Sequence, residues 1–268
     1  MLEIKDKLEE LKNMLQNMQR IMVAFSGGVD SSFLIKVAHD VLQDDVLAVT
    51  ARSVTFPERE FKLASEFAAQ LGVKQLIITC EELEIDGFST NPVNRCYLCK
   101  KELFSKIKLV GQEYQCNYIL DGSNLDDTGD YRPGMQALEE LGIVSPLKEV
   151  GLTKREIRQL SKEYNLPTWD KPAFACLSSR FPYGHEINIQ KLNMVEKAEV
   201  YLLNKGFKTV RVRHHEDIAR IEVSYDERFK FFESGTMDKV NEEFRRIGFN
   251  YVTLDLQGYR AGSMNEVL

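Results

Sequence analysis

The sequence has no long apolar run. Its longest runs, such as residues 21–25, are far too short to cross a bilayer. The first residues alternate charge and leucine at helical spacing and hold no apolar segment of the kind that a signal peptide needs. We therefore expect a cytoplasmic protein with no membrane association. Hydrophobic residues make up 43% of the 268 residues and charged residues 28%, which is typical of a globular protein and excludes a disordered chain.

An excess of basic residues is also missing. The chain holds 35 Lys and Arg against 41 Asp and Glu, a net charge of −6, and neither half is strongly basic. Proteins that bind the phosphate backbone of nucleic acids normally carry a basic surface. Nucleic acid is therefore not expected as the main partner.

Metal-ligand residues are few, with five cysteines and four histidines. Cys96 and Cys99 form a CxxC pair predicted to lie just before a helix, but there is no second CxxC and no fitting histidine pair. A closed zinc site and a disulfide framework are therefore poorly supported, and redox or metal chemistry is the better interpretation. Cys80 and Cys116 fall in or next to predicted strands and are interpreted as small buried hydrophobes.

Short apolar runs alternate with helical segments in the first part of the chain. Strands are predicted at 21–25, 46–50, 74–78 and 118–120, and helices at 2–19, 31–42, 58–71 and 100–114. This α/β order predicts an open parallel sheet with helices on both faces.

A loop rich in Pro, Ser and Gly at 172–184 ends that pattern. Beyond it we predict helices at 188–203 and 238–247 and strands at 209–213, 219–223 and 251–256. The chain is thus divided into domains 1–180 and 181–268, the second a smaller α+β domain for substrate binding or oligomerisation.

The strongest motif is the segment SGGVDSS at 26–32, directly after a predicted strand and at the start of a helix. Gly27 and Gly28 let the backbone approach an anion closely, and the helix N-terminus binds phosphate oxygens. The hydroxyls of Ser26, Ser31 and Ser32 add donors, and Asp30 suits Mg²⁺. No lysine follows the glycines, which disfavours a kinase-type loop. The alternative is a glycine turn with a serine cap.

Further ATP contacts are expected at the carboxyl ends of the neighbouring strands, where open parallel sheets bind their ligands. Candidates for the adenine, ribose or phosphates are Ala24, Thr50, Ala51, Arg52, Ser53, Gly122, Ser123 and Asn124. The loop after the fourth strand adds Asp126, Asp127, Asp130 and Arg132 as metal or phosphate ligands, with Asp30 and Asp127 as the Mg²⁺ pair. Any one of these residues taken alone is better explained as part of a solvated loop, and the functional interpretation rests on the cluster.

The SGGVDSS segment resembles the PP-loop of the N-type ATP pyrophosphatases, which include GMP synthetase, NAD synthetase, asparagine synthetase and the tRNA thiolases. The resemblance implies an adenine nucleotide α-hydrolase-like fold. It also implies cleavage of ATP between the α and β phosphates, which adenylates an acyl or carbonyl oxygen.

Segments over nearly the full length resemble the LarE family of sulfur transferases. They are DGSN and DYRPG within 121–134, SSRFPYG at 178–184, TVRVRHHEDIARIEV at 209–223 and GFNYVTLDLQGYRAGSMNE at 248–266. The resemblance implies synthesis of the nickel-pincer nucleotide cofactor. Each carboxylate of a pyridinium-3,5-biscarboxylic acid mononucleotide is adenylated and then converted into a thiocarboxylate, with release of AMP and pyrophosphate. It also implies a homo-oligomer.

The LarE family has two versions, which differ in their sulfur donor. In one, a single cysteine gives up its own sulfur, and in the other three cysteines hold a [4Fe–4S] cluster with a sulfide on the open iron. Cys96, Cys99 and Cys176 match the second version. The sequence departs from the first version by having the CxxC pair, and the sacrificial position aligns with Ala175, one residue before Cys176. A cluster-bound sulfide is therefore the expected donor. The alternatives are single-use donation by Cys176, a tRNA thiolase and a non-catalytic sensor of ATP and iron.

Arg211 and Arg213 alternate along a predicted strand, so both side chains face one side, where two guanidinium groups suit a phosphate. The resemblance implies a substrate-phosphate site formed by Ser179, Arg180, Glu199, Arg211 and Arg213, and catalytic roles for Cys176, Asp30 and Ser179. The alternative is a solvated edge strand. The adjacent His214 and His215 are predicted to be surface histidines that point to opposite faces.

Overall fold

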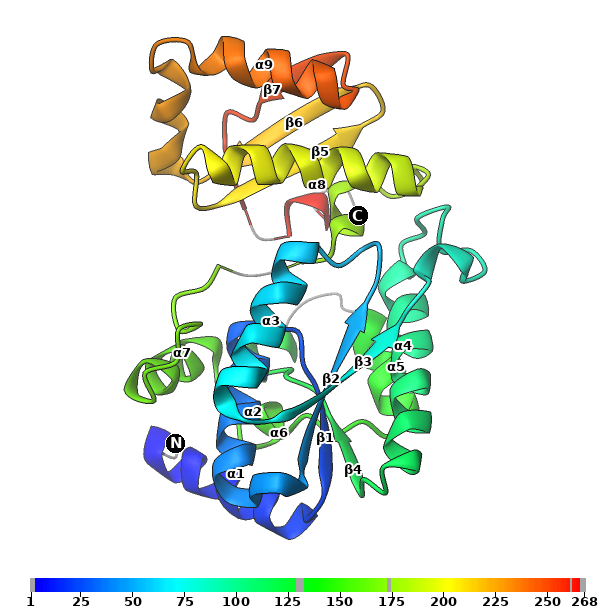
Figure 1. Cartoon of the computed structure of the whole chain (residues 1–268), viewed down its shortest axis with the longest axis vertical. Coiled ribbons are helices and arrows are strands. Elements are labelled where there is room, and N and C mark those ends of the chain that lie inside the picture. Colours follow the sequence, from blue (N-terminus) through cyan, green and yellow to red (C-terminus); the bar gives the residue numbers. More distant parts are fainter. Residues whose placement is uncertain (1–2, 129–132, 173–174, 261, 266–268) are drawn as a thin grey trace. The chain divides into compact units, whose positions relative to one another are not determined.

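The computed structural model describes residues 3–128, 133–172, 175–260 and 262–265 (Figure 1). The chain forms two compact units. Unit 1 comprises Met1–Glu81 and Asn94–Phe174, and unit 2 comprises Glu82–Val93 and Ala175–Leu268.

This division differs from the single boundary predicted at residue 180, because the segment Glu82–Val93 belongs to unit 2. Within unit 2, the amides of Gly184 and Ile187 donate to the carbonyls of Asn91 and Ser89 at 2.9 and 2.8 Å. The Asn91 side chain donates to the carbonyl of Pro182 at 2.6 Å. These hydrogen bonds join residues that are far apart in the sequence, so no local sequence pattern predicts them.

Unit 1 is built around a parallel sheet in the order β3-β2-β1-β4. Its strands are β1 (Ile21–Ala24), β2 (Val46–Arg52), β3 (Lys74–Thr79) and β4 (Tyr118–Leu120). Its helices are α1 (Ile4–Met18), α2 (Val29–Leu42), α3 (Glu58–Leu71), α4 (Arg95–Glu113), α5 (Pro133–Glu140), α6 (Pro146–Glu149) and α7 (Lys154–Glu163). The predicted α/β fold is confirmed.

Alternation along the central strand separates two cores, because successive side chains of a strand point to opposite faces. Ile21 and Val23 of β1 lie in the core formed with α1, α2, α3 and α7. Met22 lies on the other face, with Phe104 of α4 and Leu138 of α5. Helices therefore cover both faces of the sheet, as Figure 1 shows.

Two local predictions differ from the structure. Helix α4 begins at Arg95, five residues before the predicted start, so Cys96 and Cys99 lie inside the helix and not before it. The helices α5, α6 and α7 were not anticipated, although Thr153 and Glu156 form a capping box whose sequence pattern marks the start of α7.

Unit 2 has the predicted α+β composition. Its sheet has the order β5-β6-β7, with β5 (Val210–His215) antiparallel and β7 (Tyr251–Leu254) parallel to β6 (Ile218–Val223). Its helices are α8 (Ile189–Asn204) and α9 (Thr236–Ile247), and its longer 3₁₀ turns are η4 (Leu177–Arg180) and η5 (Tyr225–Phe232). Val210 and Val212 of β5 pack in the apolar core with these helices, which leaves the alternate residues Arg211 and Arg213 for the other face.

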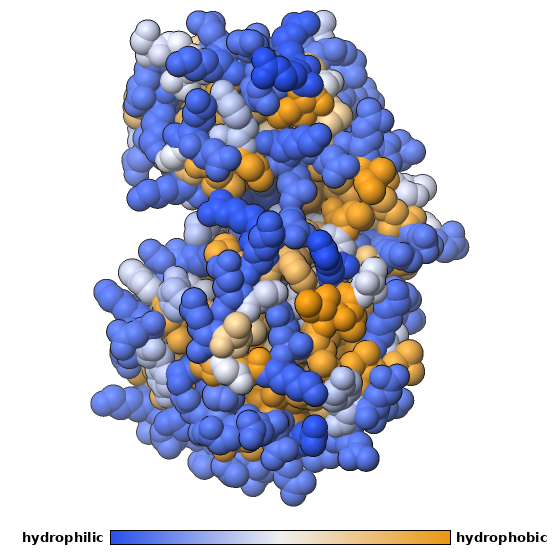
Figure 2. All heavy atoms as spheres, viewed as in Figure 1, coloured by the Kyte–Doolittle hydropathy of each residue, from blue (hydrophilic) through white to orange (hydrophobic). Residues whose placement is uncertain are grey.

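Hydrophilic side chains cover most of the molecular face drawn in Figure 2, and apolar side chains form smaller areas between them. None of the helices in the described ranges combines the length and the apolar character that crossing a membrane requires.

Candidate functional site

The loop between β1 and α2 places backbone groups at a helix N-terminus. Gly27 has φ +67°, and a Cβ at this position would lie 2.8 Å from the Cβ of Ala64 in α3. Both the left-handed backbone and the contact with α3 therefore require glycine. Gly28 is the extended N-cap of α2, and its carbonyl accepts the amide of Ser32 at 2.9 Å. The predicted phosphate loop thus has the form that an anion site needs.

The serine side chains of this loop take different positions. The Oγ atoms of Ser26 and Ser31 lie 3.2 Å apart. Ser32 is fully buried, and its Oγ has no hydrogen-bond partner among the residues that the structure describes. Ala24, the last residue of β1, is half-buried just before the loop.

The loop that follows β4 lies against the start of α2. A Cβ on Gly122 would come within 3.0 Å of the Ser31 amide nitrogen. The Asn124 side chain donates to Asp30 at 3.4 Å, and its backbone amide donates to Asp127 at 2.9 Å. The structure thus brings the 26–32 and 121–127 segments together. The predicted ligands Asp130 and Arg132 lie outside the described residues.

Asp30 carries a charge that burial disfavours. Burial raises the pKa of its carboxyl group, and the nearby Lys154 ammonium, which pairs with Asp30, offsets this only in part. The negative charge of Asp127 raises the pKa of Asp30 further. The two neighbouring carboxylates supply oxygen atoms, the ligands that Mg²⁺ prefers.

Lysine residues that the sequence analysis missed hold the loop. Lys154 stands at the first position of α7, where the capping-box pattern could have drawn attention to it. Lys171 donates to the carbonyl of Gly27 at 2.9 Å and pairs with Glu60 at 2.7 Å. No local sequence signal marks Lys171, because its partners lie more than 100 residues away.

The candidates at the end of β2 have protein partners of their own. The buried Thr50 hydroxyl donates to the carbonyl of Phe25 and accepts from Gln75, both at 2.8 Å, so it ties neighbouring strands together. Arg52 is exposed, pairs with Glu58 at 3.3 Å and lies 5.3 Å from the ring centre of Phe61.

The candidate cysteines divide between the units. Cys96 and Cys99 lie one turn apart in α4 of unit 1, the first exposed and the second half-buried. Cys176, half-buried, is the N-cap of η4 in unit 2. In the described ranges no three His, Cys, Asp or Glu side chains are grouped so as to hold a metal ion. Cys80 is buried as predicted, whereas Cys116 is only half-buried.

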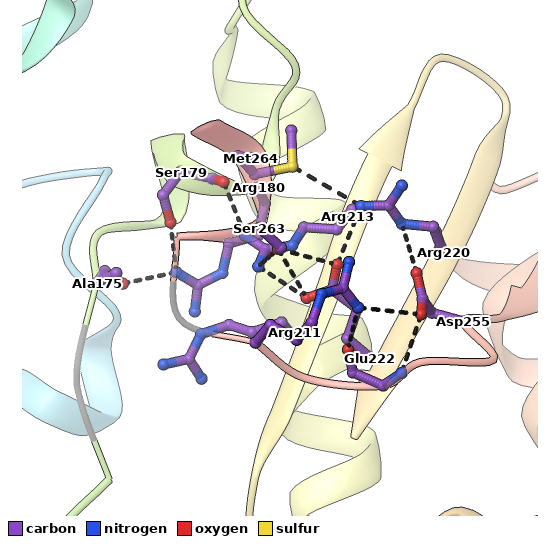
Figure 3. A network of polar contacts seen from close by, with 12 residues as sticks. Ala175, Ser179, Arg180, Arg211, Arg213, Arg220, Glu222, Asp255, Ser263 and Met264 are labelled. Carbon is purple, nitrogen blue, oxygen red and sulfur yellow. Dashed lines mark hydrogen bonds and ion pairs between the residues drawn. The ribbon is translucent and has the colours of Figure 1, made fainter. Parts of the chain in front are cut away.

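The arginines of β5 and β6 in unit 2 form a network around one carboxylate (Figure 3). Glu222, fully buried, pairs with Arg213 at 2.8 Å and with Arg220 at 3.0 Å. Arg213 also donates to the carbonyl of Ser179 at 2.9 Å and to the hydroxyl of Ser263 at 3.0 Å.

Arg211 belongs to the same side of β5 and lies 5.1 Å from the ring centre of Tyr259. Burial and the positive charge of Arg180 lower the pKa of Arg211. An anion beside Arg211 would relieve this repulsion. The predicted phosphate residues Ser179, Arg180, Glu199, Arg211 and Arg213 therefore share one region of unit 2.

His214 is not a surface histidine, contrary to the prediction. It is 3% exposed, with its ring 5.2 Å from that of Phe181 and 5.4 Å from that of Phe249. Position 214 shares the alternation of Val210 and Val212, and therefore faces the core. Burial and the charge of Lys191 lower the pKa of His214 to about 4. His215, on the other face, is half-buried.

Comparison with known proteins agrees with the loop geometry. The NAD synthase family matches residues 3–95. A subunit of the glutamine-hydrolysing GMP synthase of Archaeoglobus fulgidus is 23% identical over 219 residues, covering 77% of this chain and 69% of that protein.

Several relatives match almost end to end, among them the following two. An uncharacterised protein of Synechocystis is 42% identical over 265 residues, 99% of each chain. Pyridinium-3,5-bisthiocarboxylic acid mononucleotide synthase of Lactiplantibacillus plantarum is 41% identical over 255 residues, 95% of this chain and 92% of that enzyme. With this identity over both units, the chain belongs to the LarE family of PP-loop enzymes.

Proposed function

We propose that this protein is an ATP-dependent sulfur transferase that makes pyridinium-3,5-bisthiocarboxylic acid mononucleotide from the corresponding biscarboxylic acid. The observation that carries the proposal is the 41% identity, over 95% of this chain, to the synthase named for that product. The glycine loop at the start of α2 supports it, since this loop supplies the nucleotide site that such a reaction requires.

The first step is adenylation of a substrate carboxylate. Its oxygen attacks the α-phosphorus of ATP, and pyrophosphate leaves. The phosphates would be bound by Gly27, Gly28, Ser26, Ser31 and the α2 N-terminus, and Asp30 and Asp127 would hold Mg²⁺. The Lys154 ammonium beside Asp30 adds positive charge where the phosphate charge develops. We also propose nucleotide contacts at Ala24, Thr50, Arg52 and Gly122. The Thr50 hydroxyl already bonds to Phe25 and Gln75, so Thr50 would contact the nucleotide through its backbone.

The second step forms the carbon–sulfur bond. A sulfur nucleophile attacks the acyl carbon of the adenylate, and the bond from that carbon to the AMP oxygen breaks. AMP leaves with the bonding electron pair, and the thiocarboxylate forms. In unit 2, Arg211, Arg213 and Ser179 would hold the substrate phosphate while the carboxylates react at a fixed distance from it.

For the sulfur donor we propose a [4Fe–4S] cluster held by Cys96, Cys99 and Cys176. Thiolates suit such a cluster, and positions i and i+3 of α4 place Cys96 and Cys99 on one helix face. When bound, the cluster would supply an iron without a protein thiolate, which can carry a sulfide. The competing donor is the Cys176 sulfur itself, used once. We also propose a cytoplasmic homo-oligomer.

The test is release of pyrophosphate and AMP by protein purified without oxygen, with ATP, Mg²⁺ and the pyridinium biscarboxylic acid mononucleotide. We expect release that depends on the pyridinium substrate and is abolished in Asp30→Ala. Release that is unchanged in this variant would refute the assignment of the loop.

Iron and acid-labile sulfide per chain, measured in the same preparation and in Cys96→Ala, test the donor. A full complement that is lost in the variant is expected. Little iron in both samples would leave Cys176 as the single-use donor.

A further inference from the structure

Arg180 is buried in unit 2, with 1% of its surface exposed. Its Nε and Nη2 donate to the two carboxylate oxygens of Glu199 at 2.8 and 2.9 Å, a bidentate pair. Its Nη1 lies 2.7 Å from the carbonyl oxygen of Ala175, 2.9 Å from that of Cys176 and 2.9 Å from the Ser179 hydroxyl. A guanidinium group has five N–H donors, so at most one of them is left for any other acceptor.

Glu199 links this arginine to the scaffold. It stands on α8, and its Oε1 also accepts the amide of Val212 on the edge strand β5 at 2.9 Å. Burial opposes ionisation of the Glu199 carboxyl, but the Arg180 charge prevails and lowers its pKa. One ion pair thus connects α8, β5 and the turn before η4.

The Cys176 carbonyl oxygen is the point where this connection ends. Besides Arg180, it accepts the amide of Ser179 at 3.0 Å and the Ser179 hydroxyl at 2.8 Å. Three donors on one carbonyl fix the backbone of Cys176, whereas its side chain extends from the N-cap position of the turn.

We propose that Arg180 and Glu199 are positioning residues, which fix the backbone of Ala175 and Cys176 and so set where the Cys176 thiol is presented. They are therefore not ligands of the substrate phosphate. A phosphate that took over the Arg180 fork would leave the Glu199 carboxylate buried without its partner, which is strongly unfavourable. The phosphate role falls to Arg211 and to Nε of Arg213, which has no hydrogen-bond partner among the described residues, so that Arg213 can keep its pair with Glu222. The importance of Cys176 rests on the proposed function, but the positioning of its backbone does not.

The experiment compares Glu199→Gln with Glu227→Gln as a matched control. Gln at 199 keeps an acceptor for Val212 but removes the charge that holds Arg180. Glu227 is a buried carboxylate of the same unit that accepts the amides of Lys208 and Thr209, just before β5. Its other hydrogen bonds within the described ranges go to Ser224 and Lys230, away from the Cys176 turn. Both substitutions therefore remove one buried charge beside the same strand.

Two readouts need no substrate. We expect amide hydrogen exchange across residues 177–181 to speed up about tenfold in Glu199→Gln and to stay unchanged in Glu227→Gln. We also expect the rate of iodoacetamide alkylation at Cys176, followed by peptide mass spectrometry, to change in Glu199→Gln alone. Unchanged exchange and alkylation in Glu199→Gln would overturn the proposal, whatever the reaction is.

The kinetic readout separates positioning from phosphate binding. We expect Glu199→Gln to lower kcat for thiocarboxylate formation about tenfold and to leave the KM for the pyridinium mononucleotide within about twofold. A large rise in that KM with unchanged exchange at 177–181 would instead make the pair part of the phosphate site. Should Glu199→Gln fail to fold, Arg180→Lys serves the same test, because it keeps the charge and loses the fork.

Discussion

The nucleotide loop of unit 1 and the arginine network of unit 2 are built on different principles. The loop uses backbone groups from seven consecutive residues, and its side chains contribute little beyond hydroxyls and Asp30. The network uses charged side chains of η4, α8, β5 and β6: Arg180 pairs with the buried Glu199 and Arg213 with the buried Glu222, and the Ser263 hydroxyl accepts from Arg213. Local sequence therefore specifies the first site, whereas tertiary packing specifies the second.

The largest effect on turnover is expected from Gly27→Ala in the loop of unit 1. A Cβ at position 27 would lie 2.8 Å from the Cβ of Ala64. Alanine would also have to adopt the left-handed backbone conformation of Gly27, which is unfavourable for it. Because the proposed phosphate site consists of backbone groups of this loop, we expect pyrophosphate release to fall at least about 100-fold.

The matched control is Gly142→Ala. Gly142 has the same φ of +67° but nothing within 4 Å of an added Cβ. It should cost stability of about 1 kcal/mol and leave turnover intact. Equal losses of turnover in the two variants would show that backbone strain, and not the loop geometry, is responsible.

A smaller effect is expected from Lys171→Met, which frees the Gly27 carbonyl. We expect the KM for ATP to rise about tenfold, because the loop loses its fixed conformation while its phosphate donors remain. The measurement is initial pyrophosphate release against ATP concentration.

Lys7→Met provides the control for that loss. Lys7 also bonds a glycine carbonyl, that of Gly151, and pairs with a carboxylate, that of Glu156, and its side chain is as buried as that of Lys171. Its removal should reduce stability similarly without changing the KM for ATP. A rise in KM in both variants would mean that general loosening of unit 1 accounts for the effect.

In unit 2, acid is expected to reduce the free energy of unfolding through His214. His214 has a pKa of about 4 in the folded chain against 6.5 for an ordinary histidine. The unfolded chain therefore binds more protons in this range, and stability is lost as the pH falls from 6.5 towards 4. With partial solvent screening the loss is on the order of 2 kcal/mol.

His214→Phe removes the titrating group and fits between two phenylalanine rings. Urea unfolding of both proteins at pH 7 and pH 4.5 measures the difference. We expect the variant to lose less stability than the parent on acidification, and an equal loss would show that His214 is not responsible.

The smallest effect concerns the stability of unit 1. Burial raises the pKa of Asp30 in the folded chain, so its contribution to stability is largest in acid and falls as the pH rises from about 4 through the raised value. Asp30→Asn has no such loss. Thermal unfolding should therefore favour the variant by a few degrees at pH 7, and by less at pH 4, although its turnover is lost. A less stable variant at pH 7 would mean that the Lys154 pair outweighs the burial.

The sequence predicted the elements whose signals are local. Apolar runs located the strands of unit 1, and the glycine–serine pattern located the phosphate loop. The helices α5, α6 and α7 escaped notice, although the Thr153–Glu156 capping pattern was present. The start of α4 was also placed too late, although Asn94, a residue type favoured at the N-cap, directly precedes Arg95.

The features that the sequence analysis missed depend on contacts between distant segments. Lys171 holds the loop across 144 positions of sequence, and the Glu82–Val93 segment joins unit 2 through hydrogen bonds to residues near 184. His214 was misjudged for a different reason. Its place on the core face follows from strand alternation with Val210 and Val212, which the sequence already contained.

In the proposed reaction, the chain replaces a carboxylate oxygen by sulfur and cleaves ATP to AMP and pyrophosphate. Its most direct test is the mass of the pyridinium mononucleotide after incubation with anaerobic protein, ATP and Mg²⁺. We predict a product in which sulfur replaces one oxygen in each carboxylate, with one AMP and one pyrophosphate formed per sulfur, and no such product from Asp30→Ala. Formation of AMP and pyrophosphate with an unchanged substrate mass, or a thiocarboxylate formed without ATP, would contradict it.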